Sequence, residues 1–596
     1  MKSYIKRVFS LDYRSIAALR IIIGLTLLFD VIQRSTSLIA HYTDLGLLPR
    51  SELFRIDNYN GYWSLHFING SPLFISILFI IAGVFALMMI VGYRTRIATI
   101  VSFIMLISIH NRNPMVLQGG DVALRVILFW MIFMPLANRF SLDNILNKTK
   151  NLVESNNYFA IPGIIYSLQF ISIYFFAGFM KDGAPWVSTY NAVGLTLALD
   201  QFTTYFGVWL KSMPKILPII TIFTLWLERY LFVFFIFPFK NSWARLIGVF
   251  LAAMLMIGIN LSLKLGLFGM IMVAISIGLL PGVFWDKIIN PIRFYFINKS
   301  KINFTIFYDF ECGFCYKMVH VIKTLFLLHP GTRILPASSN PQIQDLMDQK
   351  NSWVVKDPQG NFYTGFSAFV CILRSSFLFK IFVPFLKIKP ISFIGEKIYR
   401  LVANNRALTC NTHIVNSQYK TDIYLKTLRN SVLIILFGTV TIWNIHYLPK
   451  YTKINVHPVL EKILFVIRLD QKWGMFAPYP TTNDGFYVIP GILADRSNVD
   501  VYTGSHTISY DKPQHMSDTY KNQRWQKYLM NIWDDNYKEY RLGYARYLCR
   551  TWDENHYKEQ ELMKFSIVYI LENTDINTLE EQPLQQLVIW EHNCLG

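Results

Sequence analysis

Long apolar runs constrain this chain more than any other feature of its sequence. A run of about 17–25 residues with few charges can cross the hydrocarbon core of a bilayer as a helix. Candidate runs occupy residues 16–38, 72–92, 97–111, 122–137, 159–181, 216–238, 243–263, 265–285 and 430–448. The runs at 97–111 and 122–137 are the shortest. The sequence therefore predicts a polytopic membrane protein with about nine spans.

Composition also favours a bilayer as the surrounding medium. Hydrophobic residues make up 53% of the 596 residues, whereas charged residues make up only 16%, below the roughly 25% of a typical soluble domain. The net charge of +19 raises the question of nucleic-acid binding. However, Lys and Arg gather in loops beside the apolar runs, and no basic stripe with interleaved aromatic residues is present. We expect a lipid bilayer as partner and no nucleic acid.

The distribution of basic residues predicts an orientation, because cytoplasmic loops carry an excess of Lys and Arg. If the N-terminus is cytoplasmic, the loops with Arg94 and Arg96, with Arg139, Lys148 and Lys150, with Lys240 and Arg245, and the stretch 287–301 all fall on the cytoplasmic side. The N-terminal apolar run contains Arg20, Asp30 and Arg34 and lacks a small-residue cleavage site, so we interpret it as an uncleaved first span rather than a signal peptide. We expect a multi-pass protein of a bacterial-type inner (plasma) membrane.

A strand followed by two closely spaced cysteines marks a soluble module. The β-like run Phe304–Tyr308 precedes Cys312-Gly-Phe-Cys315, and a helical run follows. A strand leading to C-x-x-C at a helix start is the thioredoxin-like redox arrangement. The N–H groups and dipole of the helix favour the thiolate of Cys312, and Cys315, one turn later, can resolve a mixed disulfide. We predict Cys312 as the attacking thiol and Cys315 as the resolving thiol.

Half of a metal site is the alternative interpretation of this cysteine pair. Zinc takes about four protein ligands in structural sites, but no second C-x-x-C exists and His320 has the wrong spacing for a zinc finger. We therefore predict no metal. Six cysteines in a chain of this length do not suggest a disulfide framework, and Cys371 and Cys410 are expected to be buried residues.

These observations predict four segments. They are a membrane domain of about eight helices at 1–288, a cytoplasmic module at 302–428, a further span at 430–448, and an extracytoplasmic domain at 449–596. The last segment has strand-like runs at 486–489, at 499–502 and near Phe565, and a helical stretch at about 518–549. The predicted fold class is mainly α. It combines a polytopic helical membrane bundle, an inserted thioredoxin-like α/β domain and a C-terminal extramembrane α+β domain.

Charged residues inside spans are costly and point to functional sites. Asp121 and Arg125 lie four residues apart on one helix face, so they can neutralise each other. Arg20 can form a pair between helices with Asp30 or with Glu228.

Lys181 ends the fifth apolar run and has two interpretations. It can be an interfacial lysine that extends toward water, with Trp186 as its anchor. Alternatively, it can be a desolvated lysine that acts as a general base near neutral pH. The sequence leaves both open.

The cysteine module resembles the DCC thiol-disulfide oxidoreductase-like family. The opening motif is Tyr308-Asp309-Phe-Glu-Cys312-Gly-Phe-Cys315, and further matching segments are 334–336, 352–360, 363–368 and Tyr399 with Asn405-Arg406. Asp309 is the Asp of the family's Asp-Cys-Cys motif, whereas Phe310 stands where the family usually has Gly. The resemblance covers about 303–410 and implies thiol-disulfide redox activity.

The membrane part resembles the HTTM family, which includes the vitamin K-dependent gamma-glutamyl carboxylases. The matching segments are Asp12-Tyr-Arg14 with Arg20, 41–50, 111–125 with Asp121 and Arg125, 138–143, 174–186, Glu228, 265–268, 471–480 and 546–552. Lys181 matches the position of the base that deprotonates the reduced quinone in the carboxylases. Met256 stands where the family often has a histidine, and Gly269 where it often has a proline.

Three functions follow from these patterns and resemblances. The first is a membrane redox protein that couples the dithiol to a quinone-type site near Lys181 and acts on a peptide or protein substrate. No cofactor is certain, and a quinone is the one that the resemblance implies. The second is a carboxylase-like membrane enzyme. The third is a non-enzymatic membrane scaffold or thiol sensor.

Overall fold

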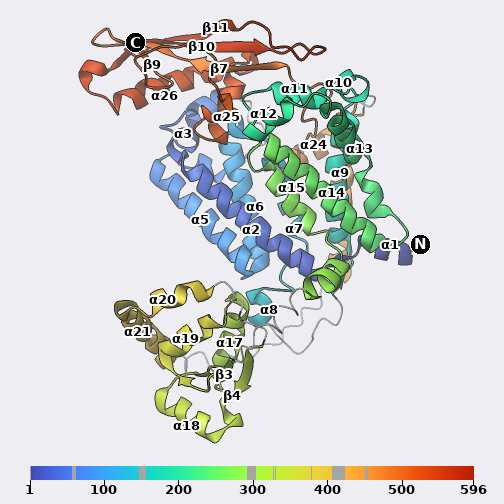
Figure 1. The fold of residues 1–596 in the computed structure, drawn as a ribbon, viewed down its shortest axis with the longest axis vertical. Coiled ribbons are helices and arrows are strands. Elements are labelled where there is room, and N and C mark those ends of the chain that lie inside the picture. The colour runs from blue at the N-terminus through green and yellow to red at the C-terminus, as the bar shows by residue number, and fades with distance from the viewer. Residues whose placement is uncertain are drawn as a thin grey trace.

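The computed structural model has a helical bundle at its centre, a sheet domain above it and a small α/β module below it (Figure 1). The structure describes residues 2–56, 62–146, 156–291, 304–326, 328, 331–376, 379–405, 423–449 and 454–595. Most of these residues are helical.

Six helices in the described ranges are long and apolar enough to cross a membrane. They are α2 (Tyr13–Ser35), α5 (Pro72–Val91), α9 (Ile161–Met180), α13 (Leu217–Ile236), α14 (Asn241–Ser262) and α23 (Ile423–His446). Large apolar side chains such as Leu73, Ile80, Ile219 and Phe250 are exposed on α5, α13 and α14. Such exposure is stable where lipid surrounds the helix, which supports a multi-pass membrane protein.

Six of the nine predicted spans correspond to these helices. The other three runs form α6 (Thr95–Arg112), α7 (Gly119–Met131) and α15 (Phe268–Ile277). At 1.5 Å per residue, the 13 residues of α7 and the 10 of α15 are too short for the hydrocarbon core, and α6 is less apolar because Arg96 and Arg112 lie within it. Nearly all of α7 is buried. Its apolar residues therefore belong to the core of the bundle rather than to its lipid-facing surface.

Local sequence explains where the first long helices begin and end. The carboxylate of Asp12 caps α2 by accepting from the backbone N–H of Arg14 at 2.8 Å. Ser71 caps α5, Pro72 occupies its first turn, and Gly92 ends it with φ of 71°. A Cβ on Gly92 would lie 2.5 Å from a guanidinium nitrogen of Arg20, so glycine also makes room for that buried side chain.

The module below the bundle contains a four-stranded sheet. Its strands are β3 (Thr305–Tyr308), β4 (Arg333–Pro336), β5 (Val354–Lys356) and β6 (Phe362–Tyr363), in the order β4-β3-β5-β6. Strands β3 and β4 are parallel, and the other pairs are antiparallel. The helices are α17 (Gly313–Leu325), α18 (Pro341–Lys350), α19 (Gly365–Arg374), η5 (Phe379–Phe382), α20 (Val383–Leu386) and α21 (Lys389–Asn405).

A five-stranded antiparallel sheet forms the outer domain. It consists of β7 (Asn483–Val488), β8 (Pro490–Leu493), β9 (Asn498–Asp500), β10 (Leu562–Asn573) and β11 (Gln585–Asn593). Helices α25 (Gln523–Ile532) and α26 (Arg541–Asp553) lie between the sheet and the bundle (Figure 1). The predicted helical stretch at 518–549 is thus two helices, separated by the 3-10 helix η7 (Asp535–Tyr540).

Candidate functional site

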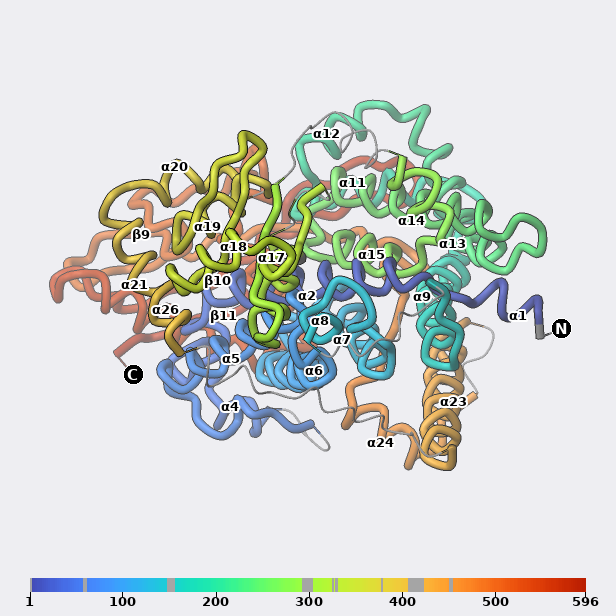
Figure 2. The backbone as a smooth tube through the Cα atoms, turned by 90° about the horizontal axis from the view of Figure 1, so that it is seen from below, coloured from blue at the N-terminus to red at the C-terminus, as the bar shows by residue number. Residues whose placement is uncertain are grey.

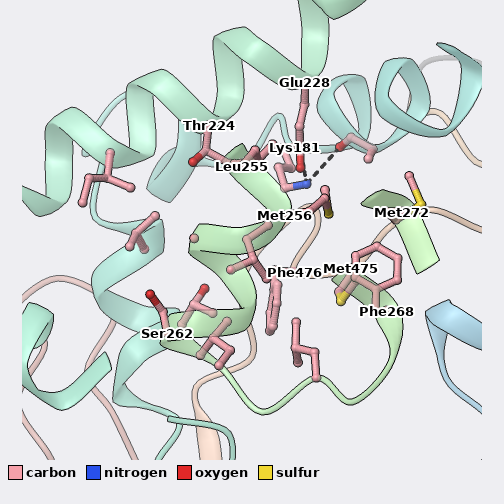
Figure 3. A pocket seen from close by; sticks show the side chains of 18 of the residues that line it. Lys181, Thr224, Glu228, Leu255, Met256, Ser262, Phe268, Met272, Met475 and Phe476 are labelled. Carbon is pink, nitrogen blue, oxygen red and sulfur yellow. Dashed lines mark hydrogen bonds and ion pairs between the residues drawn. The ribbon is translucent and has the colours of Figure 1, made fainter. Parts of the chain in front are cut away.

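An apolar cavity of about 350 Å³ opens among α9, α13, α14 and α15. The segment 472–476, which precedes the outer domain, closes part of its wall. Figure 3 shows Leu255, Phe268, Met475 and Phe476 around the cavity, with Lys181 and Glu228 at one end. A largely apolar pocket of this size with a few polar groups is typical of a small-molecule site.

Lys181 and Glu228 form a buried pair at this end of the cavity. Lys181 Nζ lies 2.6 Å from Glu228 Oε2, and the two residues are only 4% and 6% exposed. The ammonium group also lies 5.2 Å from the ring centre of Trp186. Lys181 is therefore not an interfacial lysine that extends to water, and the interpretation as a desolvated group fits the geometry better.

Close packing of two helices brings this pair together. Lys181 follows the last residue of α9, and Glu228 lies within α13. A Cβ on Gly178 would lie 2.7 Å from the backbone nitrogen of Arg229. The absence of a side chain at Gly178 thus allows α9 and α13 to approach each other at this level.

Tyr174 adds a polar group to the cavity. Its ring lines the cavity, the residue is 2% exposed, and its hydroxyl has no hydrogen-bond partner among the described residues. An unpaired buried hydroxyl costs free energy. A ligand with an oxygen near Tyr174 would remove that cost.

The two positions that depart from the HTTM pattern both lie at or near this cavity. Met256 lines it (Figure 3), so a thioether occupies the expected position of an imidazole. A Cβ on Gly269 would lie 2.5 Å from Asn260 Nδ2. Gly269 therefore accommodates the side chain of Asn260.

The other charged residues of the bundle form pairs different from those predicted. Asp121 does not neutralise Arg125. Its carboxylate accepts from Arg34 at 2.5 Å and from Arg524 of the outer domain at 2.6 Å, while Arg125 pairs with Asp470 at 2.8 Å. The observed pairs differ from the predicted one because a buried guanidinium pairs with whichever carboxylate the packing of the helices brings close to it. That carboxylate can lie far away in the sequence.

Arg20 pairs neither with Asp30 nor with Glu228. Its guanidinium donates to the backbone carbonyl of Ile90 near the end of α5, and to the carbonyls of Leu136 and Phe140 in the loop that follows α7. Asp30 instead accepts from Arg34 and Arg524, and Glu228 accepts from Lys181. Carbonyl groups at helix ends lack helical partners and accept well from arginine.

The cysteine pair lies at the predicted junction of β3 and α17. Reactive atoms of Asp309, Cys312 and Cys315 all lie within 4.8 Å of one another. Both cysteines are buried. Cys312 is disulfide-bonded, and Cys315 is not. Among the described residues this group offers three potential metal ligands, fewer than the roughly four of a structural zinc site.

The remaining cysteines differ in their environments. Cys371 is buried as predicted, and burial raises the pKa of its thiol to about 12. Cys410, which was also expected to be buried, lies outside the described residues. The outer domain contains a disulfide between Cys549 and Cys594 that the sequence did not predict.

The cavity and the cysteine pair lie at opposite ends of the bundle. Lys181 is close to α10 (Ala184–Val187), beneath the outer domain, whereas α17 lies in the module at the other end (Figure 1). Helix α17 packs against α8 (Leu142–Leu146), which belongs to the loop between α7 and α9. The two sites therefore do not exchange groups directly.

Sequence analysis missed Arg524, Arg34 and Asp470 as partners of the charged residues, and it named Tyr174 only as part of a matching segment. For Asp30 and Arg34, the i, i+4 spacing is a signal from which their contact could have been predicted. Nothing in the sequence linked Arg524 to a bundle more than 400 positions away.

Comparison with known families identifies two parts of the chain. Residues 10–281 match the model of the HTTM domain. Residues 306–411 match the model of the DCC1-like thiol-disulfide oxidoreductase. No curated protein and no solved structure shows a significant match to the chain.

Proposed function

We propose that this chain, in which an HTTM domain is joined to a DCC1-like thiol-disulfide oxidoreductase domain, is a membrane redox protein with two separate sites. One is the dithiol at Cys312 and Cys315, and the other is a quinone-type lipid site beside Lys181. The observation that carries the second site is the buried Lys181–Glu228 pair at the end of an apolar cavity.

The cavity has the properties that a quinone-type ligand needs. Its apolar walls suit a ring and the start of an isoprenoid tail, and Lys181, Glu228 and the unpaired hydroxyl of Tyr174 can hydrogen-bond ring oxygens. Exposed apolar side chains on the neighbouring helices α13 and α14 support a site beside lipid, from which such a ligand can enter.

Lys181 is the proposed base at this site. In the observed pair the ammonium group donates to Glu228. Transfer of that proton to the carboxylate removes a charge separation that low polarity disfavours, and the neutral amine of Lys181 can then accept a proton from a hydroquinone hydroxyl.

The soluble module is proposed to be thioredoxin-like. Its sheet order β4-β3-β5-β6 and the placement of the cysteines between β3 and α17 support this assignment. When the module is reduced, the thiolate of Cys312 attacks a partner disulfide and releases one partner thiolate. Cys315 then attacks the Cys312 sulfur, which releases the second partner thiolate and leaves the module oxidised by two electrons.

The proposed location is a bacterial-type inner membrane with the N-terminus and the module in the cytoplasm. The outer domain then faces an oxidising compartment, where a disulfide such as Cys549–Cys594 is expected to persist. Because the two sites lie at opposite ends of the bundle, a diffusible carrier must connect them if they act together.

The carboxylase-like alternative has less support. Met256 lines the cavity where that chemistry would use a histidine, and a thioether is only a weak acceptor. The scaffold alternative predicts that the dithiol does not react with disulfides and that the cavity binds no ligand.

Binding of decylubiquinone to the full chain in lipid nanodiscs tests the membrane site. Trp186 and Trp473 line the cavity, so binding should quench tryptophan fluorescence. The variants Lys181→Met and Glu228→Gln should weaken binding by at least roughly tenfold, the effect of losing about 1.4 kcal/mol. Lys558→Met, which removes an exposed lysine of the outer domain, should bind like the wild type. Equal binding by all four proteins would rule out the site.

A further inference from the structure

Helix α21 of the soluble module presents its apolar residues outward. Ile394, Ile398, Leu401 and Val402 follow the i, i+4, i+7, i+8 spacing of one helix face, and all four are exposed. The exposed fractions of Ile398 and Leu401 are 60% and 67%. A helix on the surface of a soluble domain normally has the opposite arrangement.

The inward face of α21 is held by polar contacts and a glycine. The carboxylate of Glu396 accepts from the backbone N–H of Phe366 at 2.8 Å, and the Tyr399 hydroxyl accepts from the backbone N–H of Trp353 at 3.1 Å. A Cβ on Gly395 would lie 2.4 Å from the ring of Phe366. These contacts fix the rotation of α21, so its apolar face cannot turn inward.

The exposed surface continues onto the preceding segment. Helix α20 and η5 pack beside α21 and α19. Ile381 and Phe382 of η5, Phe385 of α20, and Ile388 between α20 and α21 are exposed. We call these four residues, together with Phe393, Ile394, Ile398, Leu401 and Val402, the apolar patch. Contiguous apolar surface of this kind marks an interaction site.

Basic residues surround the apolar patch. Residues 379–405 include five basic side chains and a single acidic one; they are Lys380, Lys387, Lys389, Lys397, Arg400 and Glu396. Glu396 is paired with Arg400 at 3.0 Å. Apolar residues flanked by lysines are typical of segments that lie in the interface of an anionic membrane.

The position of the apolar patch relative to the bundle favours the same partner. The module packs through α17 against α8, whose Asp143 caps the start of α6 by accepting from the backbone N–H of Thr95 at 2.8 Å. The module therefore lies at the end of the membrane bundle. Figure 1 shows α20 level with α8, and Figure 2, seen from below, shows α20 and α21 beside the bundle rather than beneath it.

We propose that α20 and α21 lie in the headgroup region of the same bilayer that the bundle crosses, with the apolar patch in the acyl boundary and the lysines at anionic lipid headgroups. The module would then be attached to the membrane at two places, through α8 and through its own lipid-facing surface. This attachment holds the end of α17 with Cys312 at a fixed height above the membrane.

Photo-crosslinking of the full chain in nanodiscs tests this proposal. The photoreactive amino acid p-benzoylphenylalanine replaces Phe385 or Phe393, two ring-for-ring changes within the apolar patch. The control carries it at Gln349, which is exposed on α18 at the end of the module far from the bundle (Figure 1). We expect lipid adducts by mass spectrometry at Phe385 and Phe393 and not at Gln349. Crosslinked dimers, adducts to another protein, or no adducts at Phe385 and Phe393 would overturn the proposal.

The lysines give a second test. In nanodiscs with anionic lipid, Lys387→Gln and Lys397→Gln should each lower the adduct yield by up to about fivefold, which corresponds to about 1 kcal/mol per basic residue at such a surface. In purely zwitterionic nanodiscs, the same variants should match the parent protein. An equal effect in both lipids would contradict the electrostatic part of the proposal. Decylubiquinone binding near Lys181 is independent of both tests, so failure here leaves the proposed function intact.

Discussion

Arg524 of the outer domain places its guanidinium 2.6 Å from the carboxylate of Asp121 in the membrane bundle. The same guanidinium lies 2.8 Å from Asp30, and Arg34 contacts both carboxylates from the other side. Two arginines and two aspartates, all buried, thus balance their charges where α25 meets the bundle. The outer domain and the bundle are therefore coupled by a charge network that neither can satisfy alone.

Removing one member of this network should destabilise the whole protein. Arg524→Leu leaves Asp30 and Asp121 with a single arginine in a buried site, and an uncompensated buried charge costs about 3–5 kcal/mol. Arg524→Lys should recover only part of the loss, because lysine lacks the fork that reaches both carboxylates. Thermal unfolding in nanodiscs measures the effect.

A surface arginine of the same domain provides the control. Arg546 is 60% exposed and pairs with Glu52, so Arg546→Leu should cost less than about 1 kcal/mol. Similar melting temperatures for Arg524→Leu and Arg546→Leu would show that the network does not couple the two parts.

Tyr174→Phe should separate stability from ligand binding at the cavity. The hydroxyl is buried and unpaired among the described residues, so its removal should leave the ligand-free protein as stable or stabilise it by up to about 1–3 kcal/mol. The same change should weaken decylubiquinone binding, because the ligand loses a donor. Melting temperatures with and without decylubiquinone test both effects; a destabilised variant with unchanged binding would assign the hydroxyl a purely structural role.

The sequence predicted the local features of both sites and missed most contacts between distant segments. The strand, C-x-x-C and helix order depends on neighbouring residues, and the structure has it at β3 and α17. Lys181 was identified from its place in a matching segment, but its partner Glu228 was considered only as one of two possible partners of Arg20. Helix periodicity determines which residues share a face, whereas the pairing of faces depends on the packing of helices. Positions such as Gly178, where a Cβ would collide with the next helix, determine that packing without an obvious pattern.

Helix packing also decides which apolar runs are buried within the bundle. An apolar run predicts burial, but it does not distinguish burial in protein from burial in lipid. Helix α7 is surrounded by other helices, whereas α5 exposes Leu73 and Ile80, and both have runs of similar character in the sequence. Helix α21 shows the same ambiguity in the soluble module, because apolar periodicity alone does not tell whether the apolar face lies inward or outward.

Cys371 should contribute no thiol reactivity to the module. Burial raises the pKa of Cys371 to about 12, so its thiol stays protonated and unreactive near neutral pH. After reduction of the full chain, Cys312→Ser should abolish exchange with a small disulfide substrate, whereas Cys371→Ser should leave the rate unchanged. Stopped-flow exchange with a chromogenic disulfide measures both rates. Loss of exchange in Cys371→Ser alone would contradict the assignment of Cys312.

Asp484 should make the stability of the outer domain depend on pH. The residue is 1% exposed on β7 and accepts from the backbone N–H groups of Gln201 and Gly485. Burial raises the pKa of its carboxyl to about 7, and the negative charges of Asp200 and Glu572 act in the same direction. The folded state therefore holds this proton more tightly than the unfolded state, whose carboxyl has the ordinary pKa of about 3.9.

The sign of the effect follows from proton linkage. Between about pH 4 and pH 7 the folded protein binds more protons than the unfolded chain, so this group lowers stability as pH rises, by up to about 1.4 kcal/mol per pH unit. Above about pH 7 the loss is complete and constant. Asp484→Asn imitates the protonated acid, so the melting temperature of the variant minus that of the wild type should rise from pH 4 to pH 7 and then level off.

Asp495→Asn is the matched control for this profile. Asp495 is exposed on the same domain, and hydrogen bonds from Ser497 hold the pKa of its carboxyl below the ordinary value. The stabilisation that Asp495 contributes is present above about pH 4 and is lost only in stronger acid. The difference in melting temperature between Asp495→Asn and the wild type should therefore stay constant from about pH 4.5 to pH 8. The difference for Asp484→Asn should increase over the same range up to about pH 7. Parallel profiles for the two variants would mean that Asp484 is ionised in the folded protein throughout this range, and that the backbone N–H groups of Gln201 and Gly485 outweigh the cost of burying its charge.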